Sequence, residues 1–260
     1  ERTTAGLFLM AGSASGQTPI PSRLVEEGAA ATPPHASVTR DADGRFTMRA
    51  VRLTEPIQFD GRLDEQVYGT VSPISGFVQT MPDHGQPGTQ RTEAWILFDS
   101  TDIYVSGRCW DTRPESAWTA NEMRRDRVAQ TDNFGVAVDP FLVRKNGYIF
   151  YANPVGGFAD LSITNQGQAN HDFNPVWRVK TGRFDGGWTI EMQIPFKSLR
   201  YPPGASQVWG VQLRRTVRDR NEWTYATPLP ISIGPMGLPR VSTAATLVGL
   251  EAPAGSKNLE

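Results

Sequence analysis

Hydrophobic and polar residues alternate with a period of two along much of the chain from Phe46 onward. This period is typical of β-strands, because successive side chains of a strand point to opposite faces of its sheet. Turn-forming residues divide the alternating stretches into short segments. The pattern predicts strands at Arg91–Phe98, Ile103–Trp110, Asn133–Val138, Tyr148–Asn153, Trp177–Phe184, Trp188–Ile194, Trp209–Val217, Glu222–Thr227 and Thr246–Leu250.

The first two predicted strands form a hairpin whose register can be read from the sequence. The turn-forming tetrapeptide Asp99-Ser100-Thr101-Asp102 joins them. Pairing of Phe98 with Ile103 sets a register in which both faces match chemically. This register places three further pairs opposite each other: Ile96 and Val105, Leu97 and Tyr104, Glu93 and Arg108.

A second hairpin is expected at Arg183–Trp188, because Asp185-Gly186 is a typical two-residue turn. Only Leu63–Tyr68 resembles a helix, and it is short. Many short strands with turns at regular spacing predict an all-β fold, specifically an antiparallel β-sandwich of the jelly-roll type. We expect one such domain with a flexible N-terminal segment.

The composition divides the chain into four parts. Residues 1–16 contain a short apolar run followed by small residues, with Ala14 and Gly16 placed like the −3 and −1 positions of a signal-peptidase site. We interpret this part as a signal-peptide-like remnant, with a frayed tail as the alternative. Residues 17–45 are rich in Pro, Ala, Ser and Gly and predict a flexible linker. The sandwich is expected at 46–252, and a C-terminal tail or truncated junction at 253–260.

Charge and composition argue against several functional classes. A net charge of −1 and a pI near 6.4 argue against nucleic-acid binding, which needs a strongly positive face. Cys109 is the only cysteine, so an intramolecular disulfide and a thiolate metal cluster are excluded. The three histidines, His35, His84 and His171, lack metal-ligand spacing. No stretch of ~18 apolar residues, as a membrane-spanning helix needs, occurs in the sequence.

The sequence carries no recognisable catalytic motif. A nucleophile elbow, a phosphate-binding glycine loop, a His-Glu-x-x-His helix and a paired-cysteine zinc pattern are all missing. A glycosidase needs two facing carboxylates. The candidates are Glu93, Asp111, Asp126, Asp132 and Glu191. Acidic residues on a polar strand face are commonly solvated or salt-bridged. We therefore assign no catalytic residue and keep an O-glycosyl hydrolase as an alternative.

Tryptophan is the stronger functional signal. The seven tryptophans are Trp95, Trp110, Trp118, Trp177, Trp188, Trp209 and Trp223. Sugars present apolar C–H faces that stack on indole rings, so exposed tryptophans in a β-sandwich suggest carbohydrate binding. Trp188 and Trp209 are in phase with apolar positions and are predicted to lie in the core. Trp110 and Trp223 lie near strand ends or beside charged residues, where a ligand could reach them.

Five sets of residues follow one another in a characteristic order. They are Ile57–Glu65, Arg91–Glu93 with Ile103–Val105 and Asp111, Asp132–Asp139, Gly187–Phe196, and Trp209–Gln212. In this order they resemble the family 9 carbohydrate-binding domains. Four further segments resemble the subgroup that places this domain ahead of an outer-membrane β-barrel: Arg124–Asp126, Asn146–Tyr148, Asn153–Gly156 and Pro195–Tyr201.

The resemblance implies a non-catalytic carbohydrate-binding module, acting in carbohydrate catabolism. It also implies export in a Gram-negative bacterium, to the periplasm, the outer membrane or the cell surface. The expected partner is an oligo- or polysaccharide, and association with an outer-membrane β-barrel is a further expectation. The alternative is a structural accessory domain of a barrel protein that binds no sugar.

The resemblance also locates a binding face, and the sequence departs from the family there. Sugar-binding members clamp a ring between two tryptophans, and the corresponding positions are Ala129 with Gln130 and the segment Leu229–Ile231. The family's acidic contact falls at Gly135. Polar and aromatic residues remain there, and we predict as ligand-binding Arg125, Asp126, Asp132, Asn153, Arg214, Trp223 and Tyr225. Some members hold structural calcium, for which Asp60, Asp64, Asp111 and Asp139 are oxygen ligands of the right type; salt bridges to arginines are the alternative.

Overall fold

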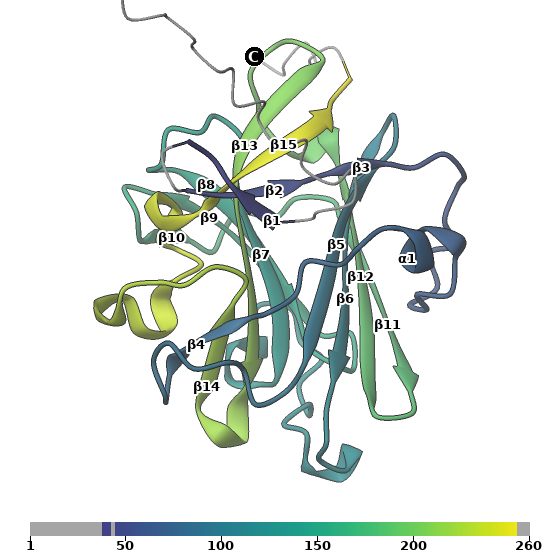
Figure 1. Cartoon of the computed structure of the whole chain (residues 1–260), viewed down its shortest axis with the longest axis vertical. Helices are drawn as coiled ribbons and strands as arrows, with labels where there is room; N and C mark the ends of the chain where they lie inside the picture. The colour runs from purple at the N-terminus through teal and green to yellow at the C-terminus, as the bar shows by residue number, and fades with distance from the viewer. Residues whose placement is uncertain (1–37, 43–44, 254–260) are drawn as a thin grey trace, which may run out of the picture. The chain divides into compact units, whose positions relative to one another are not determined.

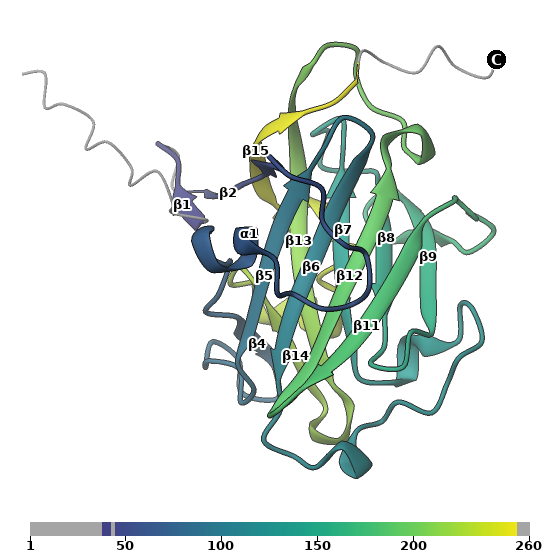
Figure 2. The same cartoon turned by 90° about the vertical axis from the view of Figure 1, so that its right-hand side faces the viewer.

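A computed structural model describes residues 38–42 and 45–253 as two β-sheets that pack face to face (Figure 1 and Figure 2). In the larger sheet the strand order is β1-β2-β15-β13-β7-β8-β9-β10, with β14 beside β13 and β4 beside β14. Its strands are β1 (Val38–Arg40), β2 (Phe46–Arg49), β4 (Val78–Met81), β7 (Asn133–Asp139), β8 (Gly147–Ala152), β9 (Phe158–Thr164), β10 (Gln168–Asn170), β13 (Ser206–Val217), β14 (Glu222–Tyr225) and β15 (Ala245–Glu251).

The smaller sheet has the strand order β11-β12-β6-β5-β3. Its strands are β3 (Val51–Arg52), β5 (Thr92–Phe98), β6 (Asp102–Trp110), β11 (Arg178–Phe184) and β12 (Gly187–Pro195). Helical segments are short and lie in the connections: α1 (Gln66–Thr70) and the 3₁₀ turns η1 (Glu115–Ala117), η2 (Val128–Gln130), η3 (Phe196–Ser198), η4 (Arg218–Arg220), η5 (Ile231–Met236) and η6 (Val241–Thr243). In the described part of the chain, no helix has the length and apolarity needed to cross a membrane.

The predicted all-β sandwich is confirmed, and so is the register of the first hairpin. β5 and β6 pair with Phe98 opposite Ile103 and with Glu93 opposite Arg108. The second predicted hairpin also forms, with Phe184 paired with Gly187. Gly186 in its turn has a φ of 93°, a left-handed value that glycine adopts without a steric penalty. Alternation and turn chemistry were therefore sufficient to place these strands.

The structure differs from the predictions mainly at the edges of the sheets. β2 pairs in parallel with β15, and β3 pairs in parallel with β5, so both sheets are mixed rather than purely antiparallel. Strand β1 lies within the range predicted as linker and pairs with β2. The helix α1 begins at Gln66 rather than Leu63. Residues 1–37, which include the signal-peptide-like segment, and residues 254–260 lie outside the described part of the chain.

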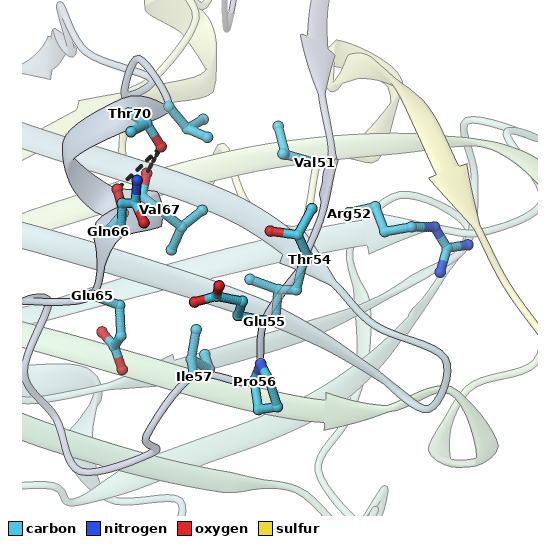
Figure 3. Close-up of a pocket in the computed structure, with 12 residues that line it drawn as sticks. Val51, Arg52, Thr54, Glu55, Pro56, Ile57, Glu65, Gln66, Val67 and Thr70 are labelled. Atoms are coloured by element: carbon cyan, nitrogen blue, oxygen red, sulfur yellow. Dashed lines mark hydrogen bonds between the residues drawn. The ribbon is translucent and has the colours of Figure 1, made fainter.

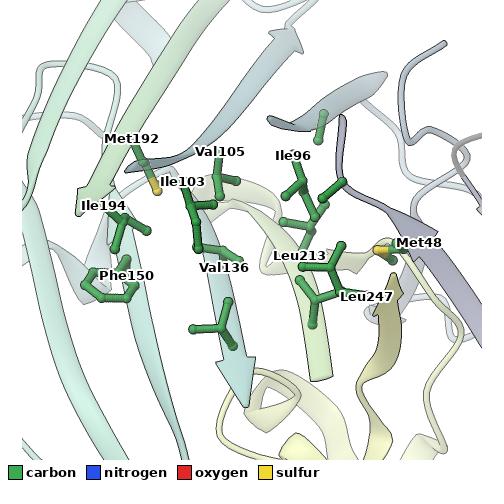
Figure 4. Close-up of a cluster of buried hydrophobic side chains, with 14 of the residues drawn as sticks. Met48, Ile96, Ile103, Val105, Val136, Phe150, Met192, Ile194, Leu213 and Leu247 are labelled. Carbon is green, nitrogen blue, oxygen red and sulfur yellow. The ribbon is translucent and has the colours of Figure 1, made fainter. Parts of the chain in front are cut away.

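The hydrophobic core lies between the two sheets. Figure 4 shows part of it, with side chains from both sheets pointing toward one another. The residues labelled there are Met48, Ile96, Ile103, Val105, Val136, Phe150, Met192, Ile194, Leu213 and Leu247. Trp188 and Trp209 are fully buried in this core, as their phase in the sequence predicts. Burial of apolar surface, at roughly 25 cal/mol per Å², is what holds the two layers together.

Candidate binding site

Three of the predicted ligand-binding residues, Arg214, Trp223 and Tyr225, lie on the outer face of the larger sheet, the face turned away from the core. Along β13, Leu213 belongs to the core between the sheets, whereas Arg214 occupies the opposite face. Cross-strand pairing places Tyr225, Arg214, Gly135 and Tyr151 in one row across β14, β13, β7 and β8. This row forms the centre of the candidate site.

Arg214 is the partly exposed cation of this row. Its Nη2 donates a hydrogen bond to Asn133 Oδ1 at 2.8 Å, and its guanidinium lies 5.6 Å from the ring centre of Tyr151. Arg214 Nε and Thr216 Oγ1 are shielded and have no hydrogen-bond partner among the described residues. Because Arg214 and Thr216 are two residues apart on one strand, both face the same side of the sheet. The side chains of Arg214 and Thr216 thus each keep one buried polar atom without a hydrogen bond.

Tyr151 and Asp126 complete the polar surroundings of Arg214. Burial raises the pKa of Tyr151, the nearby Arg214 opposes the rise, and Asp126 and Asp160 add to it. Asp126 is exposed, has a left-handed φ of 62° and accepts a hydrogen bond from the Asp160 amide at 3.3 Å. Arg125 Nη2 donates to Asp160 Oδ2 at 2.6 Å. Asp126 and Arg214 are therefore the polar groups near Tyr151, whereas Arg125 binds Asp160 on the side of β9 that faces the core with Phe150.

Three of the predicted residues are buried and serve as internal anchors. Asp132 accepts hydrogen bonds from Arg113 Nη2, Thr119 N and Arg218 N. Asn153 donates to the Glu122 carbonyl at 2.6 Å and accepts from the Gly157 amide at 2.9 Å. The Tyr225 hydroxyl donates to the Pro235 carbonyl at 2.8 Å and accepts from the Gly237 amide at 3.0 Å. These side chains hold the loops in place rather than facing solvent.

Trp223 is partly buried and adjoins a second apolar cluster on the outer face. The Arg218 guanidinium lies 5.7 Å from its ring centre. The cluster consists of Val128, Ala137, Ile149, Tyr151, Ala159, Leu161, Ile163, Tyr225, Leu229 and Leu238. Val128 comes from η2, and Leu229 and Leu238 flank η5, so two loops cover this part of the sheet.

This covering fills the position where the resemblance placed an acidic ligand contact. A Cβ at Gly135 would lie 2.7 Å from Tyr151 Cβ and 3.2 Å from Leu238 Cδ1. At the two positions that correspond to the family's tryptophan clamp, the exposed residues are Ala129, Gln130 and Ile231, none of which has an aromatic ring. A sugar ring sandwiched between tryptophans therefore has no counterpart at these positions, and the accessible groups are those around Arg214.

We expect Gly135→Ala to lower the free energy of unfolding by about 1–3 kcal/mol, because overpacking forces neighbouring side chains out of place. Chemical denaturation would measure this change, with Gly69→Ala as the control, since a Cβ added at Gly69 meets nothing within 4 Å. A Gly135→Ala variant as stable as the native chain would show that Tyr151 and Leu238 do not pack tightly against Gly135.

Two of the candidate catalytic carboxylates are neutralised by the same arginine. Arg113 Nη2 lies 2.7 Å from Asp111 Oδ2 and 2.9 Å from Asp132 Oδ2. Arg215 also contacts Asp111 Oδ2, at 3.0 Å. Burial opposes ionisation of Asp111, but hydrogen bonds from Arg113 outweigh it and hold the pKa of this carboxyl below its usual value. Glu93 is likewise paired, with Arg91 and Arg108. These carboxylates act as structural ion pairs.

The carboxylates considered as calcium ligands are not gathered into one site. Within residues 38–42 and 45–253, no group of three or more His, Cys, Asp or Glu side chains is placed to hold a metal ion. Asp111 forms the salt bridges described above, which was the alternative use. Asp139 accepts a hydrogen bond from the Arg144 amide at 2.6 Å, and Asp60 accepts one from the Arg62 amide at 2.9 Å. Asp64 is exposed.

Glu191 anchors a long connection to the outer face of the smaller sheet. Its Oε2 accepts a hydrogen bond from the Gly61 amide at 2.8 Å, and its Oε1 accepts one from the Tyr68 hydroxyl at 3.2 Å. Burial, together with the nearby charge of Glu65, raises the pKa of Glu191 to about 7 despite the Gly61 hydrogen bond. The same connection walls a cavity of about 480 Å³, which Figure 3 shows between residues 51–57 and α1. None of the predicted ligand-binding residues lines it.

No family model matches this sequence, and no curated protein matches it either. Solved structures do. A family 9 carbohydrate-binding module from Caldicellulosiruptor kristjanssonii in complex with cellotriose superposes with a TM-score of 0.53 and 13% identity, covering 82% of this chain and 97% of the module. The glucose complex of such a module from the same organism gives 0.53 and 14%, covering 82% and 99%.

A third structure, from Bacteroides uniformis and assigned as carbohydrate-binding, superposes with a TM-score of 0.61 and 10% identity, covering 79% of this chain and 98% of its own. At these identities the agreement concerns the fold. The described domain therefore has the β-sandwich fold of the family 9 carbohydrate-binding modules.

Proposed function

We propose that this domain is a non-catalytic carbohydrate-binding module that binds saccharide through Arg214 and its neighbours on the outer face of the larger sheet. The fold supports this proposal, since two structural neighbours are modules in complex with cellotriose or glucose. The observation that carries it is the partly exposed Arg214 guanidinium, which lies in one row with Tyr151 on the outer face of the larger sheet. A guanidinium donates hydrogen bonds and a sugar hydroxyl accepts them, so the exposed part of Arg214 can bind a hydroxyl group.

Trp223 and Asp126 support the same ligand chemistry. Trp223 supplies a partly exposed aromatic ring, on which the C–H face of a sugar can stack. The exposed Asp126 carboxylate accepts hydrogen bonds from hydroxyl groups. Export to the periplasm or cell surface belongs to the same proposal and is supported by the signal-like pattern of residues 1–16; recovery of the intact, unprocessed chain only from the cytoplasm would contradict it.

Isothermal titration calorimetry with neutral oligosaccharides tests the binding proposal. We expect Arg214→Ala and Trp223→Ala each to weaken binding at least tenfold, which corresponds to about 1.4 kcal/mol. Arg214→Lys should recover little, because an ammonium group lacks the planar fork of the guanidinium. Arg200→Ala, at an exposed position, is the matched control and should bind like the native chain. Native affinity in both site variants would refute this site.

A further inference from the structure

A polar groove lies where the β11–β12 hairpin, the loop between β8 and β9, and η1 come together; the hairpin is at the lower end of Figure 2. It consists of two cavities of about 650 and 590 Å³ that share Glu115 and Arg183. Asp60 and Arg62 line the first cavity, and Trp118 and Asp185 line the second. Both volumes fall within the roughly 300–1,000 Å³ typical of small-molecule sites.

Arg183 is held in place at the centre of this groove. Its Nε donates to Glu115 Oε1 at 2.7 Å, and its Nη1 donates to the Pro154 carbonyl at 2.6 Å. Its guanidinium also lies 5.1 Å from the ring centre of Trp118. An arginine fixed by three neighbours loses little side-chain entropy on binding, and such preorganisation favours affinity.

The backbone around Arg183 is equally constrained. A Cβ at Gly182 would overlap the Gly61 carbonyl oxygen, and a Cβ at Gly187 would overlap the Cys109 carbonyl oxygen. The hairpin therefore packs against its neighbours with no room for a side chain at either position. The groove is walled by a rigid element, which is the kind of support that a precise binding site needs.

The charges of the groove are balanced. Its lining contains four acidic residues, Asp60, Asp111, Glu115 and Asp185, and three arginines, Arg62, Arg113 and Arg183. Asp111 and Arg113 neutralise each other through their ion pair. A strongly anionic or cationic ligand gains little from such a surface, since attraction to one sign is offset by repulsion from the other. A neutral ligand with many hydroxyl groups fits the alternating donors and acceptors.

Trp118 adds an aromatic surface to these polar groups. Its ring lines the second cavity and packs from there against the core. Its indole Nε1 is shielded and has no acceptor among the described residues. A buried indole N–H ordinarily finds a partner. The Trp118 ring packs against the core and carries the Arg183 guanidinium above it, so it holds Arg183 in position in the groove.

We infer that this groove is a second saccharide site, separate from Arg214, and that it binds a neutral oligosaccharide along its two cavities. Arg183, which lies over the Trp118 ring, and Glu115 provide the hydrogen bonds. The inference rests on the proposed carbohydrate-binding function and deepens it: a ligand spanning two cavities is a chain of several sugar units rather than a monosaccharide.

Calorimetry of the full chain with four probes tests this inference: glucose, cellotetraose, xylotetraose and the acidic tetragalacturonate. We expect a neutral tetrasaccharide to bind at least tenfold more tightly than either glucose or tetragalacturonate. The expected stoichiometry is two sites per chain. Arg183→Ala and Glu115→Gln should leave one site. Arg52→Ala is the matched control, since Arg52 forms a comparably exposed ion pair with Glu251 at 2.5 Å, and it should keep two sites.

The variants separate the two proposals. If Arg183→Ala loses one binding site and Arg214→Ala keeps both, the groove is supported and the Arg214 site is refuted. If Arg214→Ala loses one site and Arg183→Ala keeps both, the groove is refuted. Trp118→Ala should also remove the groove site; if it fails to fold, the exposed Arg183 and Glu115 decide the matter. Unchanged stoichiometry and affinity in Arg183→Ala overturn the inference, and failure of all four probes to bind overturns both proposals.

Discussion

Replacing Arg215 with methionine is expected to lower the free energy of unfolding by about 3 kcal/mol or more. Arg215 is 1% exposed and extends from β13 into the interior, where its guanidinium lies 5.8 Å from the ring centre of Trp188. It donates to the Trp110 carbonyl at 2.6 Å, to the Arg91 carbonyl at 3.2 Å and to Asp111 at 3.0 Å. Methionine fills similar space but removes these three hydrogen bonds to buried acceptors, although the Arg91 carbonyl still accepts from the Trp110 amide at 3.0 Å.

Guanidinium unfolding followed by tryptophan fluorescence would measure this change. The matched control is Arg200→Met, at an exposed position, where a change within about 0.5 kcal/mol is expected. Asp111 keeps its contact with Arg113 in the variant. The loss of stability therefore comes mainly from the hydrogen bonds to the two carbonyl groups and from the ion pair between Arg215 and Asp111. A loss below 1 kcal/mol would mean that Arg215 does not hold β5, β6 and β13 together.

Glu191→Gln is expected to make the domain more stable at pH 8 and to remove a pH dependence of the native chain. The pKa of Glu191 is raised to about 7 in the folded state, mainly by burial. Between its ordinary value of 4.5 and about 7, the folded state binds more protons than the unfolded state. The unfolding free energy of the native chain should therefore fall as pH rises through this window, by on the order of 3 kcal/mol.

Glutamine can keep both hydrogen bonds while removing the charge. Its carbonyl accepts from the Gly61 amide, and its amide donates to the Tyr68 hydroxyl, which in turn donates to Ser106 Oγ, 2.8 Å away. Denaturation series at pH 5, 6, 7 and 8 would compare this variant with Glu55→Gln, at an exposed position. If Glu191→Gln retains the slope of the native chain across this window, Glu191 is not the group responsible.

The strands that the sequence predicts best are those whose partners are close in the chain. The β5–β6 hairpin follows from alternation and one turn, because a slip of one residue would turn Ile96 and Val105 away from the core. The parallel pairing of β2 with β15 joins segments about two hundred residues apart, and no local pattern marks it. Composition likewise predicted a linker at Val38–Arg40, whereas these residues form strand β1 by pairing with β2.

The candidate site was predictable in its residue types but not in the exposure of its side chains. Alternation correctly turns Arg214 away from the core, yet it cannot show that Leu238 packs over Gly135. Asp132 and Tyr225 have the chemistry of ligand-binding groups, but loops that approach from distant segments occupy their hydrogen bonds. The groove at Arg183 has no signature in the sequence, because Trp118 and Glu115 are more than sixty residues away from Arg183 in the chain.

Saccharide binding by this sandwich can be tested most directly by titrating the ¹⁵N-labelled chain with cellotetraose in two-dimensional NMR spectra. The arginine Nε–H and indole Nε1–H signals report on the two sites. Saturable shifts are expected for Arg214 and Trp223 at one site and for Arg183 and Trp118 at the other, while the buried Trp188 and Trp209 stay unchanged. Spectra that do not change at millimolar cellotetraose, xylotetraose or glucose would contradict carbohydrate binding by this domain.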